Sequence, residues 1–197
     1  MSPLAAWREF TSSVRADHRV TRSIRERYPT DGPSMQPKGF FVAAVTNVGL
    51  QMLIAVRFMR LLRNLGVPGG PQVVSRLIRH LYSAEIHWNA EIAPGVSIVH
   101  GTGLVISHGS VVGPNCMLFQ NVTLGESMHS SRRTVGSPTL LADVHVMPGA
   151  VLLGPITVGE SSKIGANAVV DTDLEARSVV RSPASDVTHR SNDGAQR

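Results

Sequence analysis

Residues 140–170 read LLADVHVMPGAVLLGPITVGESSKIGANAVV, and a branched aliphatic residue returns in this stretch at every sixth position. The repeated positions are Leu140, Val146, Leu152, Val158, Ile164 and Val170. A second small or apolar residue follows four places after each of the first five, at Val144, Ala150, Ile156, Ser162 and Ala168. An α-helix does not produce this period, because its side chains return to one face after three or four residues. A coil with three short strands per turn does produce it when each six-residue unit forms one flat side.

An upstream copy of the repeat precedes this stretch. Its aliphatic positions are Ile86, Ile92, Ile98 and Leu104 and, after a shift of two residues, Val112, Leu118 and Leu124. The two copies hold about twelve units, which predicts a parallel coil of about four turns. Such a narrow interior suits small aliphatic side chains, and only 5% of the residues are aromatic. Cys116 falls on an inward position, so we expect a packed thiol rather than a nucleophile.

The 84 residues before the coil follow a helical pattern. We expect helices over 3–27, 40–63 and 71–84, the last because Pro71 suits a first helical turn. Polar residues interrupt the apolar stretch 40–56, which is also short for a membrane span, so we interpret it as a buried helix. The sequence therefore divides into an α-helical region over 1–84, a coil over 85–180 and a polar tail over 181–197.

Positive charge is concentrated in the helical region. Residues 1–84 hold 12 Lys and Arg against 4 Asp and Glu, whereas residues 85–180 hold 4 against 8. A basic region can face a phosphate-bearing cofactor, an anionic membrane or nucleic acid, or it can form a solvated helix face. The spacing of three to four residues favours the solvated face for Arg15, Arg19, Arg22, Arg25 and Arg27. The coil is acidic and poor in aromatics, so we expect no nucleic-acid partner, and contact with a membrane surface is the less favoured interpretation.

The cysteine content and the first residues of the sequence indicate the cellular compartment to expect. The single cysteine excludes an internal disulfide and a Cys-rich zinc module, and no histidine spacing matches a zinc signature, so we expect no metal. Residues 1–11 lack the apolar core of a signal peptide. We therefore expect a cytoplasmic protein.

The six-residue period is lost across residues 125–139, which predicts an excursion loop on the coil surface. This loop contains His129, Arg132 and Arg133. Loops on rigid scaffolds commonly carry binding residues, although a tolerated insertion is the alternative interpretation.

Several short stretches match one enzyme family. They are Glu85-Ile86-His87, His100-Gly101-Thr102-Gly103, Gln120-Asn121-Val122-Thr123-Leu124-Gly125, Lys163-Ile164-Gly165-Ala166 and Pro183-Ala184. Together with the hexapeptide coil, they resemble the left-handed parallel β-helix acyltransferases, and serine acetyltransferase in particular. The resemblance covers residues 45–184. It implies a mainly β fold, a left-handed parallel β-helix of hexapeptide repeats preceded by a small α-helical N-terminal region.

The same resemblance implies an acetyl-CoA-dependent O-acetyltransferase that acts on the hydroxyl of a small acceptor, L-serine, as in cysteine biosynthesis. His100 would be the general base, since the pKa of histidine lies near working pH, and Glu85 would orient it. Gly125 matches a position along the thiol arm of the cofactor, and Lys163 and Ala166 match positions near its pantetheine and phosphates. A homotrimer or a dimer of trimers, with sites between neighbouring subunits, is also implied.

Five positions depart from the family pattern, and the first is Glu85, which stands where the family usually has an aspartate. Pro148 lies at a cofactor-lining position but has no backbone N–H to offer. Val99, Gly136 and Ser137 replace groups that help to hold the amino-acid acceptor. These departures leave two alternatives open, an O-acetyltransferase acting on a saccharide in polysaccharide biosynthesis and a catalytically silent scaffold. In the excursion loop, His129, Arg132 and Arg133 could supply the missing acceptor contacts, because arginine binds carboxylates bidentately.

Overall fold

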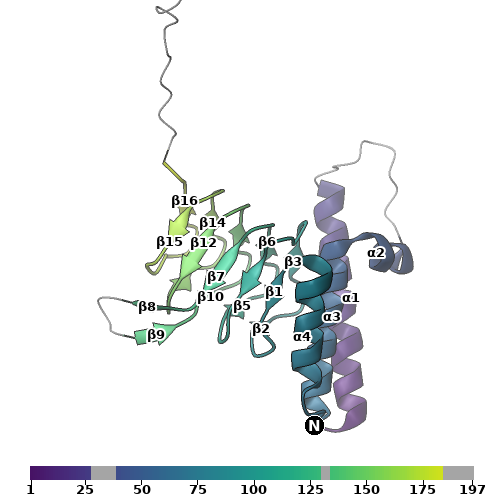
Figure 1. Ribbon diagram of the computed structural model, residues 1–197. Coiled ribbons are helices and arrows are strands. Elements are labelled where there is room, and N and C mark those ends of the chain that lie inside the picture. The colour runs from purple at the N-terminus through teal and green to yellow at the C-terminus, as the bar shows by residue number, and fades with distance from the viewer. Residues whose placement is uncertain (28–38, 130–133, 184–197) are drawn as a thin grey trace, which may run out of the picture.

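The computed structural model describes residues 1–27, 39–129 and 134–183. A bundle of helices lies at one end of a three-sided coil of short strands (Figure 1). The helices are α1 (Pro3–Arg27), α2 (Phe40–Thr46), α3 (Val48–Asn64) and α4 (Gly70–Tyr82). The strands of the first two coil turns are β1 (Glu85–Ile86), β2 (Glu91–Ile92), β3 (Ser97–Ile98), β4 (Val105–Ile106), β5 (Val111–Val112) and β6 (Met117–Leu118).

A hairpin interrupts the later turns of the coil. After β7 (Thr123–Gly125) come β8 (Ser127–His129) and β9 (Thr134–Gly136), which pair antiparallel with each other where the six-residue period is lost. The coil then resumes with β10 (Thr139–Leu140), β11 (His145–Val146), β12 (Val151–Leu153), β13 (Thr157–Val158), β14 (Lys163–Ile164), β15 (Val169–Val170) and β16 (Val179–Val180).

Every third coil strand joins the same parallel sheet. Sheet A has the order β1-β4-β7-β12-β15, sheet B the order β13-β10-β5-β2, and sheet C the order β16-β14-β11-β6-β3. Each strand is stacked one full coil turn from its neighbour, as in the pairings Ile86↔Ile106 and Ile106↔Leu124. The predicted left-handed parallel β-helix is therefore confirmed.

The inward positions of the repeat form the core. All six of the aliphatic positions from Leu140 to Val170 are buried, and so are the second inward positions from Val144 to Ala168. Cys116 is fully buried, as expected for an inward thiol. Because consecutive units place the same two positions inside, the interior is filled without large aromatic side chains.

The coil is longer than the sequence period predicted. Sheets A and C each hold five strands, so a fifth turn follows the four that the repeat indicated. β16 pairs with β14, although Val180 lies ten residues beyond the last regular repeat position at Val170. The six-residue count missed this turn because backbone pairing continues after the aliphatic spacing has become irregular.

The predicted long helix is broken at Asn47. α2 and α3 meet there at 98°, and the Asn47 side chain accepts a hydrogen bond from the Leu50 N–H at 2.8 Å, which caps α3. α2 also has no buried residue, so the expectation of one continuous buried helix was wrong. Within the described residues, no single helix is long and apolar enough to cross a membrane, whereas α2 and α3 pass that test only as a bent pair.

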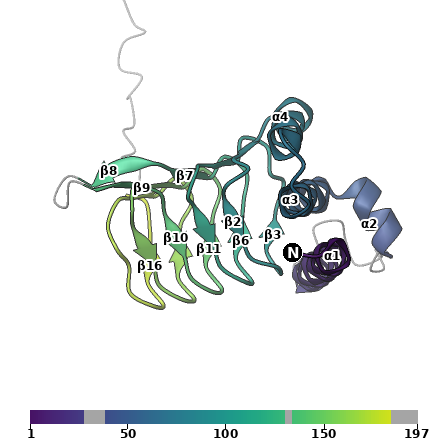
Figure 2. The ribbon, with the colours of Figure 1, turned by 90° about the horizontal axis from the view of Figure 1, so that it is seen from below.

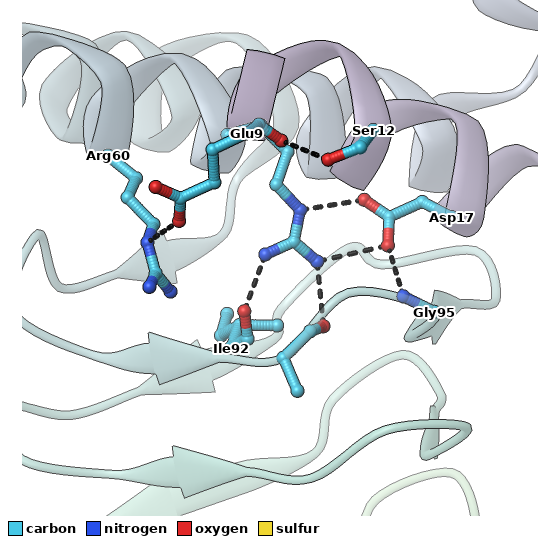
Figure 3. A network of polar contacts seen from close by, with 8 residues as sticks. Glu9, Ser12, Asp17, Arg60, Ile92 and Gly95 are labelled. Carbon is cyan, nitrogen blue, oxygen red and sulfur yellow. Dashed lines mark hydrogen bonds and ion pairs between the residues drawn. The ribbon is translucent and has the colours of Figure 1, made fainter. Parts of the chain in front are cut away.

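A buried ion pair joins the helices to the first coil turn (Figure 3). The Arg57 Nε lies 2.8 Å from the Asp17 Oδ2, and these side chains are 2% and 0% exposed. The guanidinium also donates to the carbonyls of Ile92 and Ala93, while the Gly95 N–H donates to the Asp17 Oδ1 at 2.8 Å. All the charged atoms therefore have partners, and α1, α3 and the β2–β3 turn are held in one arrangement.

Candidate active site

His100 occupies a tight turn at one edge of the coil. We call this the C/A edge, formed by the turns that lead from sheet C to sheet A, and the A/B edge is formed by the turns from sheet A to sheet B. His100 has a φ of 65°, and the Gly101 N–H donates to the Val99 carbonyl at 2.9 Å, which closes a three-residue turn around it. Residues other than glycine rarely adopt this conformation, but among the described residues it recurs in turns of this coil, as at Asn121 and Asn167, so the backbone alone does not mark a functional site. The imidazole is exposed.

Gly101 explains how the turn is held against α3. A Cβ at this position would lie 2.6 Å from the Met52 sulfur, and its φ is 69°. Only glycine combines this backbone conformation with such a close approach. The contact therefore fixes the His100 turn on a rigid helix of the bundle.

A cavity of about 630 Å³ opens beside His100, between α1, the start of α3 and the outer face of sheet C. Thr21, Asn47 and Phe119 are among the residues that line it. Of the described lining residues, only His100 and His145 carry ionisable side chains. The cavity is large enough for a small substrate and places a proton acceptor in its wall.

Glu85 has a different partner from the one expected. Its Oε1 lies 2.6 Å from the Arg79 Nη2, and both side chains are about half exposed. Among the described residues, no hydrogen bond joins Glu85 to His100. Such an exposed ion pair is weak, so the carboxylate can exchange partners at little cost.

The residues expected to bind the cofactor lie on two different edges. Pro148 and Ala166 lie in the turns of the C/A edge above His100, and Lys163 is exposed at the start of β14 in sheet C. Ala166 is exposed, and within the described chain its N–H has no acceptor, so it can donate to a ligand amide. The Pro148 carbonyl accepts from Asn167 and is engaged. Gly125 ends β7 on the A/B edge, on the far side of sheet A.

Known proteins resemble this chain in both sequence and structure. No family model matches it. A serine acetyltransferase of Helicobacter pylori is 40% identical over 118 residues, which are 59% of this chain and 68% of that relative. One of Synechococcus elongatus is 37% identical over 143 residues, 73% of this chain and 58% of that relative. The chain belongs to the serine acetyltransferase family.

Solved structures of the serine acetyltransferase family agree in fold. The Neisseria gonorrhoeae serine acetyltransferase in complex with serine has a TM-score of 0.76 at 25% identity, over 93% of this chain and 71% of that one. The Vibrio cholerae enzyme gives a TM-score of 0.77 at 26% identity. Among the curated relatives, the match spans 58%, 43% and 49% of three, so the chain covers about half of their length.

The excursion loop of this family member lies on the A/B edge. Ser137 donates from its Oγ to the His108 carbonyl, and the Ser107 Oγ donates to Ser137 at 3.0 Å. Within one chain, the loop residues described by the structure therefore do not line the cavity beside His100. The side chain of His129, together with Arg132 and Arg133, lies outside the described residues.

Two further imidazoles face each other on the same A/B edge. His87 and His108 lie in successive turns, with ring centroids 5.1 Å apart. Burial lowers the pKa of His87, the charge of His108 lowers it further, and Glu85 and Glu126 oppose the shift. The Ile86↔Ile106 register stacks the segments that carry them, and the sequence repeat did not give this register because it counted Leu104 in place of Ile106. Within the described residues, no group of three such side chains could hold a metal ion.

Proposed function

We propose that this protein is an acetyl-CoA-dependent O-acetyltransferase that acts on the hydroxyl of a small acceptor, L-serine. The observation that carries the proposal is the His100 turn, which presents an exposed imidazole at the wall of the cavity and on the same edge as Ala166. Membership of the serine acetyltransferase family supports the reaction, and a relative has been solved in complex with serine.

In this reaction His100 acts as the general base. It takes the proton of the acceptor hydroxyl as that oxygen attacks the thioester carbonyl, and it returns the proton to the thiolate that leaves when the C–S bond breaks. The Ala166 N–H can hold an amide of the pantetheine arm, so the arm would run down the C/A edge towards His100. Positioning the two substrates beside one base is the main contribution of the chain, and no covalent intermediate is needed. Glu85 orients the imidazole once it leaves Arg79.

We also propose a homotrimer in which sheet A faces the neighbouring subunits. Its outer face carries a continuous ladder in which Val105 pairs with Thr123, Thr123 with Val151, and Val151 with Val169. Val169, at the end of this ladder, is an apolar side chain that is 66% exposed in one chain. A cyclic trimer closed through sheet A would set the C/A edge of one subunit against the A/B edge of the next. This arrangement would bring Gly125 and Ser137 of the next subunit towards His100.

The trimer proposal is tested by the molar mass in solution of Val151→Lys and of Thr157→Lys. The first places a charge on the outer face of sheet A, and the second places it on the outer face of sheet B. A trimeric wild type that Val151→Lys dissociates and Thr157→Lys leaves intact supports the proposal. A monomeric wild type, or equal effects of the two variants, contradicts it.

A saccharide acceptor is the second candidate. The observation in its favour is the cavity beside His100, where the described lining residues include no carboxylate or guanidinium to pair with the charged groups of an amino acid. Threonine, asparagine and serine side chains in the lining can instead bind hydroxyls. Because acetyl-CoA is a cytoplasmic metabolite, we place either reaction in the cytoplasm.

The test of the reaction is the release of free thiol from acetyl-CoA, with L-serine and with a panel of sugars. We expect serine-dependent release that His100→Ala abolishes while the fold and oligomeric state are preserved. Thiol release with a sugar but not with L-serine would show that the protein is an O-acetyltransferase with a saccharide acceptor. No release with any acceptor, with acetyl-CoA still bound, would favour a catalytically silent scaffold.

A further inference from the structure

α2 projects from the molecule on the side of the bundle that faces away from the coil (Figure 2). None of its residues is buried, and Phe41 and Val45 are 83% and 76% exposed. We call the exposed apolar side chains of this helix and the adjoining residue the α2 patch; they are Phe40, Phe41, Val42, Val45 and Val48. A cluster of large apolar side chains on a protruding helix indicates a surface that contacts something other than water.

Basic side chains flank the α2 patch. The rings of His18 and Phe40 meet edge to face with centroids 5.4 Å apart, which places α2 against α1 at this point. Arg15 lies three residues before His18, so it shares its helix face, and Arg19 follows His18 directly. Both arginines are exposed, as their spacing predicted.

The acidic side chains described on α1 are engaged elsewhere. Asp17 is fully buried against Arg57, and the Glu9 Oε1 pairs with the Arg60 Nε at 2.7 Å. The described exposed charges beside the α2 patch that carry this argument are those of Arg15 and Arg19, and both are positive. Charge of this sign excludes a basic partner and complements an anionic one.

We propose that the α2 patch docks on an anionic membrane surface. Phenylalanine and valine side chains on a short helix can enter the boundary between headgroups and acyl chains, and adjacent arginines add attraction to anionic lipids. Binding of a helix to a membrane surface grows with the apolar area that it buries and with attraction to anionic lipid, and here both features lie where α1 meets α2. The sequence analysis gave membrane contact as the less favoured interpretation, and only the structure shows that the α2 part of the apolar stretch is exposed while the α3 part is buried.

Docking in this way has a consequence for the cavity. Thr46, Asn47 and Val48, at the junction of α2 and α3, also line the cavity beside His100. The docked protein would therefore receive its acceptor at the lipid surface. In a trimer closed through sheet A, three α2 patches would lie at the same end and bind together.

The experiment is co-sedimentation of the full chain with vesicles of phosphatidylcholine alone and of phosphatidylcholine with phosphatidylglycerol. We expect binding to the anionic vesicles that exceeds binding to the neutral ones and falls as salt is raised. The double variant Phe41→Asp/Val45→Asp should lower the bound fraction about tenfold, because both charges enter the buried part of the contact. Neither side chain is buried in the protein, so thermal unfolding should not change.

The matched control is Val73→Asp/Leu77→Asp, which places the same charges on exposed apolar positions of α4. It should bind vesicles as the wild type does, whereas Arg15→Glu/Arg19→Glu should lose the preference for anionic lipid. Equal sedimentation with neutral and anionic vesicles overturns the proposal, as does unchanged binding of Phe41→Asp/Val45→Asp. A fall in the oligomer mass of that variant would show that a second copy covers the α2 patch, which also overturns it.

Discussion

Among the polar contacts between the helical region and the coil, the buried pair of Asp17 and Arg57 should contribute most to stability. Asp17→Ala leaves the guanidinium without its carboxylate in a site that is 2% exposed. Breaking a buried pair costs about 3–5 kcal/mol, and the lower end applies because the carbonyls of Ile92 and Ala93 still accept from Arg57. The Gly95 N–H also loses its acceptor, which costs about 1 kcal/mol more. The free energy of unfolding should therefore fall by about 4 kcal/mol.

Urea unfolding followed by circular dichroism, at one fixed protein concentration, measures this loss. With a slope of about 2 kcal/mol per molar urea, the midpoint should fall by about 2 M. Asp17→Asn should cost less than Asp17→Ala, because an amide oxygen can still accept from the Gly95 N–H. The matched control is Glu9→Ala, since the pair of Glu9 and Arg60 is 33% and 42% exposed and contributes less than about 1 kcal/mol. If Asp17→Ala were no more destabilising than Glu9→Ala, the argument from burial would be refuted.

Three further predictions concern single positions. Because φ at His100 is 65°, the His100→Gly variant should be more stable than His100→Ala by about 1 kcal/mol, although glycine usually lowers stability relative to alanine. Thermal unfolding compares the two variants, and a more stable alanine variant would contradict the backbone strain. Burial raises the pKa of the Cys116 thiol from 9.0 to about 11, so the contribution of the buried thiol to stability is complete below pH 9 and is lost as the pH rises towards 11. A thiol reagent at pH 8 should label Cys116 only in urea, and rapid labelling of the native protein would refute its burial. Asn47→Ala removes the cap on Leu50 and should cost about 1 kcal/mol in urea unfolding, whereas a neutral result would show that the cap does not hold the bend between α2 and α3.

Several features of the active site could be read from the sequence and several could not. The repeat places His100 shortly after the inward Ile98, but it put the shift of two residues after Leu104, whereas the next strand position is Ile106 and the shift lies in the His100 turn. The pairing of Glu85 with Arg79 depends on where the end of α4 meets β1, which no repeat records. The cavity likewise forms between α1, the start of α3 and sheet C, segments that are far apart in the chain.

By itself, the sequence determined the coil and the identity of its core. A six-residue period states which side chains point inward at every unit, and this requirement is local, so Leu152 or Ile164 can be assigned before any contact is known. Only the tertiary structure decided how the helices are used. It broke the apolar stretch at Asn47, exposed α2, and joined Asp17 to Arg57 across 40 residues. These outcomes depend on which surfaces meet in space, and the free energy of such contacts belongs to pairs of segments that no local pattern contains.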